Sequence, residues 1–223
     1  MKIGINLVGV SYNDGSNGGR YRNYMDAIEG FTTNVINPLK EAGHEISYYL
    51  FTYESPQKDE IIKTYNPKKS TFLDPNYNKF GGGDKLENGM KTISATYINS
   101  LYELENEELD LVISTRFDIS FNKNPFKEYQ YDFNKCNYLW REPEFTHVPI
   151  VSDTFIVFPP SMTKNLIDAI IETESNPPFG VDVSMHNIYI PMCNQVGEDN
   201  VKIVCDEFKR SDINDLYKLT RNE

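Results

Sequence analysis

Strands and helices are expected to alternate along the first half of the chain, and this alternation restricts the fold more than any other feature of the sequence. Residues 2–10 form a continuous apolar run, which is typical of a strand buried on both faces. Residues 20–42 carry apolar side chains at spacings of 4, 3, 4 and 4 residues, the period of one helix face. Residues 45–53 are rich in β-branched and aromatic side chains and predict a second strand. The alternation predicts an α/β domain with a central, mostly parallel mixed sheet and helices on both faces.

The pattern continues, less regularly, as far as residue 205. We expect short strands at residues 70–73, 109–114, 154–158 and 201–205, and helices at residues 86–105, 161–171 and 181–196. The final stretch, residues 206–223, is charged and only weakly periodic. We therefore predict one domain over residues 1–205, followed by a C-terminal surface helix or by a linker within a longer multidomain chain.

Charge and cysteine content narrow the class of protein. The 223 residues include 22 Lys and Arg against 33 Asp and Glu, which gives a net charge of −11. This acidic balance disfavours nucleic acid as a partner, because phosphate backbones select basic faces. No stretch approaches the roughly 20 apolar residues of a membrane-spanning helix. The three cysteines are odd in number and widely spaced, which argues against a disulfide framework and predicts a cytoplasmic location.

Polar residues follow several of the predicted strands, where ligands of open α/β sheets bind. Three segments are expected to converge there: Gly9-Val10-Ser11, Thr52-Tyr53 and Arg116-Phe117-Asp118. A carboxylate such as Asp118, placed directly after a buried strand, can hold a hard cation against a phosphate. The alternative is an ordinary turn aspartate.

Residues 102–121 add a resemblance to this pattern. They comprise a helix, an apolar strand reading Leu-Asp-Leu-Val-Ile, and then Arg-x-Asp-Ile, and in this they resemble nucleotide-sugar glycosyltransferases of the GT-A fold. In that family an Asp-x-Asp motif after this strand binds a divalent cation, Mn or Mg. The resemblance implies that Asp118 is a metal ligand and that Arg116, which stands in place of the first aspartate, reaches a phosphate or a neighbouring carboxylate. The chain also resembles glycosyltransferase domains of large algal DNA viruses, and this resemblance implies a host cytoplasmic location.

The resemblance extends over most of the chain in the order of its elements. It implies a nucleotide-binding half at residues 1–121, in which Gly9, Val10 and Ser11 contact the base and ribose, and an acceptor-side half at residues 122–205. Asp153, just before the strand at residues 154–158, would face the sugar as the catalytic residue. His186 would be a further metal ligand; the alternative is a half-buried helix histidine.

Several other residues are candidates for binding the nucleotide sugar. Arg20 and Arg22 follow a glycine-rich loop and would reach a diphosphate, while Lys91 and Ser94 lie on the helix before the predicted metal strand. Solvated surface is the alternative for all four. Trp140, the one tryptophan, is either a platform for an acceptor sugar or part of the core.

The function predicted from the sequence is a metal-dependent glycosyltransferase that moves a sugar from a nucleoside-diphosphate sugar, with UDP as the expected nucleotide, to a glycan acceptor. The alternatives are a non-catalytic module that binds carbohydrate or nucleotide and a sugar nucleotidyltransferase. The chain has no P-loop, no dinucleotide-binding Gly-x-Gly-x-x-Gly after a strand and no Gly-x-Ser-x-Gly elbow, which disfavours those chemistries.

Overall fold

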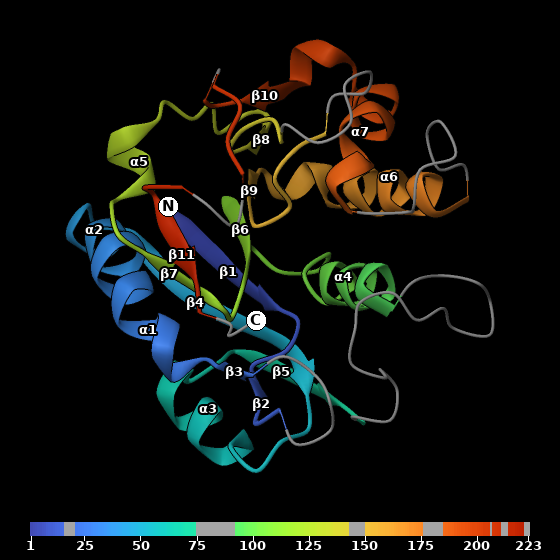
Figure 1. The fold of residues 1–223 in the computed structure, drawn as a ribbon. Coiled ribbons are helices and arrows are strands. Elements are labelled where there is room, and N and C mark those ends of the chain that lie inside the picture. The colour runs from blue at the N-terminus through green and yellow to red at the C-terminus, as the bar shows by residue number, and fades with distance from the viewer. Residues whose placement is uncertain are drawn as a thin grey trace.

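The centre of the protein is one seven-stranded sheet in the order β10-β8-β9-β6-β1-β4-β5 (Figure 1). The computed structural model describes residues 1–15, 21–74, 92–142, 150–175, 185–205, 207–210 and 214–220. In sheet order the strands are β10 (Val201–Ile203), β8 (Cys136–Tyr138), β9 (Phe155–Phe158), β6 (Leu111–Arg116), β1 (Lys2–Val8), β4 (Glu45–Tyr53) and β5 (Lys69–Leu73). Antiparallel β9 separates two parallel groups, one of β5, β4, β1 and β6 and one of β8 and β10. The predicted mostly parallel mixed sheet is confirmed.

Helices cover both faces of the sheet, as predicted. The first face packs against α1 (Met25–Phe31), the π-helical turn η1 (Thr32–Ile36), α2 (Asn37–Glu41) and α3 (Lys58–Tyr65). The second face packs against α4 (Thr92–Tyr102), α6 (Thr163–Ser175) and α7 (Tyr189–Val196) (Figure 1). Strand β1 is buried from its second residue onward, because its side chains enter both hydrophobic clusters. This explains its continuous apolar sequence.

The predicted helix at residues 20–42 begins later than expected. The short strand β3 (Arg22–Asn23) pairs with β2 (Tyr12–Asn13), and the helical segment runs from Met25 to Glu41. The π-helical turn η1 lies just before Pro38 in this segment. Proline has no backbone N–H for the helical ladder, so the wider turn lets the chain pass it without ending the helix.

The remaining described elements are short: α5 (Pro125–Glu128), η3 (Pro160–Met162), η5 (Met185–Ile188), η6 (Glu198–Asn200), β7 (Ile119–Phe121) and β11 (Tyr217–Leu219). No helix within the described ranges has the length and apolar character needed to span a membrane.

The C-terminal region differs from the prediction of a surface helix. Residues 217–219 form β11, which pairs antiparallel with β7 and places Tyr217 opposite Phe121. Tyr217 is buried, Lys218 is exposed and Leu219 is half-buried, so the burial follows the two-residue period of a strand. The segment is held by its partner strand and by aromatic packing, which its own charged sequence does not reveal.

Candidate functional site

The reversal of direction between β6 and β9 creates the candidate site. The carboxyl ends of β1, β4, β6 and β8 lie on the same edge of the sheet as the amino end of antiparallel β9. Thr115 pairs with Phe155, so the residues that follow Thr115 lie beside those that precede Phe155. The Thr115 hydroxyl also donates a 2.8 Å hydrogen bond to the Thr154 carbonyl. Arg116 and Asp118 are thereby brought close to Asp153, which is distant from them in sequence.

Asp118 is bound by two arginines. Arg116 donates from Nε to Oδ1 at 2.8 Å and from Nη2 to Oδ2 at 2.6 Å, a bidentate pair. Arg22, on β3, places its Nε 3.6 Å from Oδ2. The Asp118 side chain is only 4% exposed. Burial by itself would lower the pKa of Arg116, but the neighbouring Asp118 outweighs this effect and the pKa is raised. The guanidinium therefore carries a permanent charge.

Asp153 is a buried carboxylate that lacks part of its hydrogen bonding. Its Oδ1 atom is buried and has no hydrogen-bond partner among the described residues. The His186 ring is close by, with its Nε2 3.8 Å from Oδ1, too far for a direct hydrogen bond. The negative charge of Asp153 raises the pKa of His186, while burial opposes the shift.

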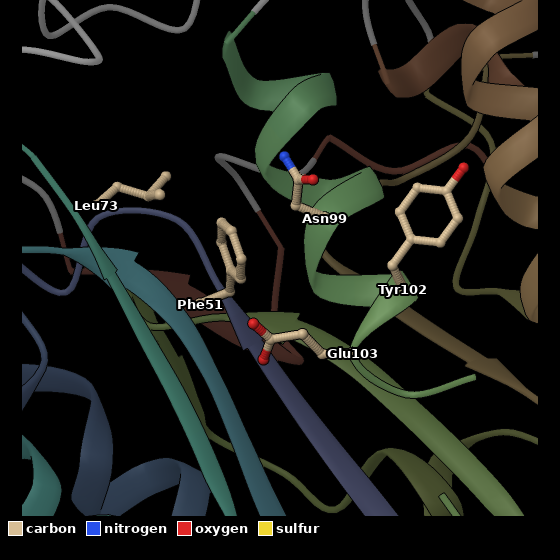
Figure 2. A pocket seen from close by; sticks show the side chains of 5 residues that line it. All are labelled: Phe51, Leu73, Asn99, Tyr102 and Glu103. Atoms are coloured by element: carbon tan, nitrogen blue, oxygen red, sulfur yellow. The ribbon is translucent and has the colours of Figure 1, made fainter. Parts of the chain in front are cut away.

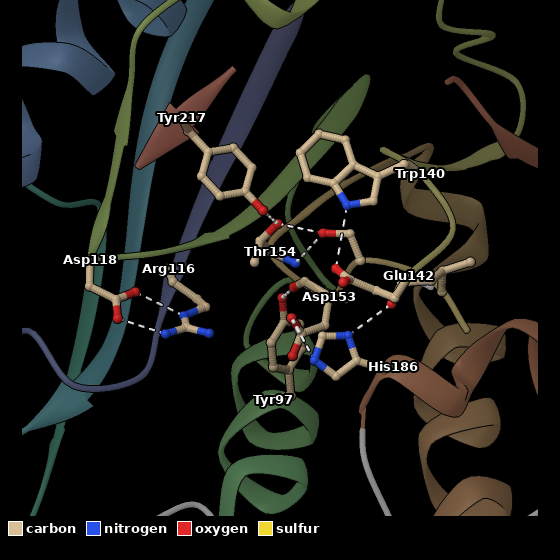
Figure 3. A network of polar contacts seen from close by, with 11 residues as sticks. Tyr97, Arg116, Asp118, Trp140, Glu142, Asp153, Thr154, His186 and Tyr217 are labelled. Carbon is tan, nitrogen blue, oxygen red and sulfur yellow. Dashed lines mark hydrogen bonds and ion pairs between the residues drawn. The ribbon is translucent and has the colours of Figure 1, made fainter. Parts of the chain in front are cut away.

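His186 is oriented by the backbone. Its Nδ1 lies 3.0 Å from the carbonyl oxygen of Val151. A carbonyl only accepts hydrogen bonds, so this contact assigns the proton to Nδ1 and leaves Nε2 of the neutral ring as an acceptor. Figure 3 shows the His186 ring and the Asp153 carboxylate facing each other.

A chain of hydroxyl groups supports the segment that carries Asp153. The Ser152 and Thr154 hydroxyls lie 2.6 Å apart, and Thr154 in turn contacts the Tyr217 hydroxyl at 2.7 Å (Figure 3). Tyr97, on α4, donates a 3.3 Å hydrogen bond to the Asp153 carbonyl. Residues from α4 and β11 thus hold the short segment before β9 in place.

Trp140 belongs to the core and does not form an acceptor platform in this structure. It is fully buried and stacks on Tyr217 with ring centroids 5.4 Å apart. Its indole Nε1 donates to Glu142 at 3.4 Å. Of the two interpretations of Trp140 drawn from the sequence, the structure supports the core.

Most of the hydroxyl side chains predicted to contact the nucleotide bind protein groups instead. Ser11 and Thr52 are buried, and the Thr52 hydroxyl donates to the Ser11 hydroxyl at 2.8 Å. The Tyr53 hydroxyl lies 3.0 Å from that of Thr96, and Ser94 donates to Glu174, which joins α4 to α6. These four residues stabilise the loops and helices around the site, a role that strand-end position alone does not distinguish from ligand contact.

The loop after β1 remains open at two of its predicted contact residues. Gly9 and Val10 are half-buried. Gly9 has a φ of +98°, which favours glycine, and a side chain added there would meet no atom of the described residues within 4 Å. Arg20 and Lys91, two further predicted contacts, lie outside the described residues.

The predicted metal centre does not fit the described residues. Both Asp118 oxygens face guanidinium groups, and the His186 ring faces Asp153 and the Val151 carbonyl. A divalent cation at Asp118 would have to displace the bidentate arginine or lie against its positive charge. Within the described ranges no three His, Cys, Asp or Glu side chains are grouped so that they could hold a metal ion. We therefore assign no metal step to Asp118 and His186.

A separate cavity of about 460 Å³ lies between α4 and the β4–β5 side of the sheet (Figure 2). Phe51 and Leu73 line it from the strands, and Asn99, Tyr102 and Glu103 from the helix. None of these residues belongs to the polar cluster around Arg116 and Asp153.

Sequence reasoning missed two residues of this cluster, Tyr97 and Tyr217. Tyr97 lies within the helix predicted at residues 86–105, and Tyr217 lies within the C-terminal segment predicted to be a surface helix or a linker. In the sequence, apolar Tyr217 and Leu219 flank charged Lys218, and this alternation was the available signal for a strand. Three residues are too few to distinguish a strand from a charged helix.

The chain was compared with family models, with curated proteins and with solved structures. No family model matches the chain, and a comparison with curated proteins finds no match. Among solved structures, an active-site mutant of LgtC has a TM-score of 0.49 at 12% identity, covering 91% of this chain and 72% of that one. The galactosyltransferase LgtC in complex with donor and acceptor sugar analogues has a TM-score of 0.48 at 12% identity, covering 91% and 73%. The glycosyltransferase GlyE of Streptococcus pneumoniae TIGR4 has a TM-score of 0.44 at 11% identity, covering 91% and 45%. At these scores the function has to be argued from the residues of the site.

Proposed function

We propose that the protein is a glycosyltransferase that moves a sugar from a nucleoside-diphosphate sugar, with UDP as the expected nucleotide, to a glycan acceptor. The observation that carries the proposal is the pairing of a fixed cation and an incompletely bonded carboxylate at one edge of the sheet, Arg116 on β6 and Asp153 before β9. This edge is where open α/β sheets bind ligands. The resemblance of residues 102–121 to nucleotide-sugar transferases supports the same conclusion.

The proposed reaction gives Asp153 one of two roles, according to the anomeric configuration of the product. The acceptor hydroxyl attacks the anomeric carbon, the bond from that carbon to the phosphate oxygen breaks, and the nucleoside diphosphate leaves with the electron pair. If the reaction inverts the anomeric configuration, Asp153 Oδ1 accepts the proton of the attacking hydroxyl. If the configuration is retained, the leaving diphosphate oxygen takes up the proton of the acceptor hydroxyl, and Asp153 accepts a hydrogen bond from a sugar hydroxyl and positions it. The anomeric configuration of the product decides between these roles.

His186 is proposed to border the sugar site. Its Nε2 lies 3.8 Å from Asp153 Oδ1, and the Val151 carbonyl keeps the ring in that orientation. A sugar hydroxyl that reaches Asp153 would therefore lie against the His186 ring.

The test is a panel of nucleotide sugars incubated with the protein in the presence of EDTA, Mg²⁺ or Mn²⁺, with release of the nucleoside diphosphate as the readout. We expect slow hydrolysis of one donor and faster release when its acceptor is supplied. An unchanged donor that still binds in calorimetry would indicate a non-catalytic binding module. Release of pyrophosphate from a nucleoside triphosphate and a sugar phosphate would indicate a nucleotidyltransferase.

A further inference from the structure

Arg116 has donor groups that Asp118 does not use. A guanidinium carries five N–H groups, and the pair with Asp118 engages Nε and one edge of Nη2. The structure shows no hydrogen bond to Nη1 within its described residues. Figure 3 shows this third nitrogen turned away from Asp118, toward the side where Asp153 lies. The Arg116 side chain is 18% exposed, so a ligand can reach it.

Asp118 is positioned to fix this guanidinium. A bidentate contact defines the plane of the group as well as its distance, and a buried carboxylate makes the contact strong. Arg22 adds a second positive charge 3.6 Å from the same carboxylate. Asp118 thus gathers two permanent cations beside Asp153, in a protein with a net charge of −11. The arrangement places guanidinium N–H donors where the sheet edge would receive an anion, while Asp118 and Asp153 balance the charges of the two arginines.

We propose that the Arg116 guanidinium, positioned by Asp118 and assisted by Arg22, binds the diphosphate of the donor and stabilises the leaving group without a divalent cation. This inference rests on the proposed function and specifies how the negative charge of its substrate is met. Nη1 and the free edge of Nη2 form the donor fork for phosphate oxygens, the geometry in which arginine recognises phosphate. Asp118 is then a positioning residue, and it does not ligate a metal.

The experiment compares binding of UDP and GDP by calorimetry, first in EDTA and then in Mn²⁺, for the wild type, Arg116→Gln and Arg116→Lys. The wild type is expected to bind one nucleotide with similar affinity in both conditions. Arg116→Gln should weaken that affinity by at least about tenfold, the lower range for a hydrogen bond to a charged group. Arg116→Lys keeps the positive charge but loses the paired N–H donors of the guanidinium. Its affinity for the nucleotide should therefore lie between those of the wild type and Arg116→Gln.

A matched control is Lys164→Gln, which removes a cation from an exposed pair on α6 and should leave the affinity unchanged. Circular dichroism and thermal melting confirm that each variant is folded. If Arg116→Gln does not fold, the wild type and Arg116→Lys still decide the question. Binding that appears only with Mn²⁺, or an affinity unaffected by either substitution at Arg116, overturns this inference and leaves the proposed function standing. No nucleotide binding in either condition overturns the proposed function and this inference together.

Discussion

Two buried carboxylates on opposite edges of the same sheet show how differently one chemical group can be used. Glu107 lies at the edge where β5 and β6 begin. Lys68 and Lys69 contact its two oxygens at 2.5 and 2.7 Å, and the Tyr49 hydroxyl donates a further hydrogen bond at 2.8 Å. Asp153 lies at the opposite edge, and one of its oxygens is buried without a hydrogen bond among the described residues.

The comparison separates a stabilising carboxylate from one available to a ligand. Protein donors fully satisfy Glu107, so its negative charge contributes to the folded state. Asp153 retains an acceptor that the described part of the protein does not use, and leaving such a group unbonded costs stability. A substrate hydroxyl that donates to this oxygen would recover that cost on binding. The following predictions test whether the two carboxylates differ in this way.

The largest effect is expected at Asp153. Asp153→Asn keeps the shape of the side chain but removes the charge and half of the acceptor capacity. If Asp153 is the base, sugar transfer should fall by about 10²–10⁴-fold, with nucleotide affinity nearly unchanged. Initial rates under saturating donor, together with calorimetry, measure both quantities. Transfer within a few-fold of wild type would assign Asp153 a purely structural role.

Glu107→Ala should affect stability and leave the chemistry alone. The buried Tyr49 hydroxyl would lose its acceptor, while Lys68 and Lys69, which are half-exposed, can turn to water. We expect a loss of about 1–3 kcal/mol in the free energy of unfolding, the cost of one unsatisfied buried group. Urea denaturation measures the loss, and the transfer rate of the folded protein serves as the control. If fully folded Glu107→Ala transferred sugar more slowly than the wild type, Glu107 would have a role beyond stability, and the proposed difference between Glu107 and Asp153 would be wrong.

Acid should weaken the Glu107 cluster over a defined range. Hydrogen bonds from Lys68 and Lys69 lower the pKa of Glu107 from 4.5 to about 2. A carboxyl group whose pKa is lower in the folded state than in the unfolded state stabilises the protein at pH values above its unfolded-state pKa. For Glu107 this contribution is lost as the pH falls from 4.5 toward 2. The stability difference between wild type and Glu107→Gln should therefore shrink across that interval. A difference that stays constant from pH 7 to pH 2.5 would show that ionisation of Glu107 does not contribute.

The smallest effect is expected at Tyr217, which supports the Asp153 segment from the C-terminal strand. Tyr217→Phe keeps the ring stacked on Trp140 and removes the hydrogen bond to Thr154. We expect a loss of about 0.5–1.5 kcal/mol in stability. The transfer rate should fall far less than in Asp153→Asn. Thermal denaturation and rate measurements on the two variants establish the order, and a larger rate loss in Tyr217→Phe would place the tyrosine itself in the chemistry.

The strands and helices with strong local patterns were predictable. The β-branched and aromatic run at residues 45–53 corresponds to β4 (Glu45–Tyr53), and the run before Pro159-Pro160 contains β9 (Phe155–Phe158). The short strands β8 (Cys136–Tyr138) and β11 (Tyr217–Leu219) were not predicted, because each has only three residues and is defined by its partner strand.

The residues of the candidate site were likewise predictable in part. From the sequence one can predict that Arg116 and Asp118 follow a buried strand and that Asp153 precedes another, because the ends of strands are visible in the local pattern of apolar residues. The sequence did not determine what these side chains contact. The approach of Arg116 to Asp153, the orientation of His186 toward Asp153, and the support from Tyr217 depend on the antiparallel register of β6 with β9 and on the packing of the C-terminal strand. These contacts form only in the folded chain, because they join residues far apart in sequence whose meeting no local periodicity records.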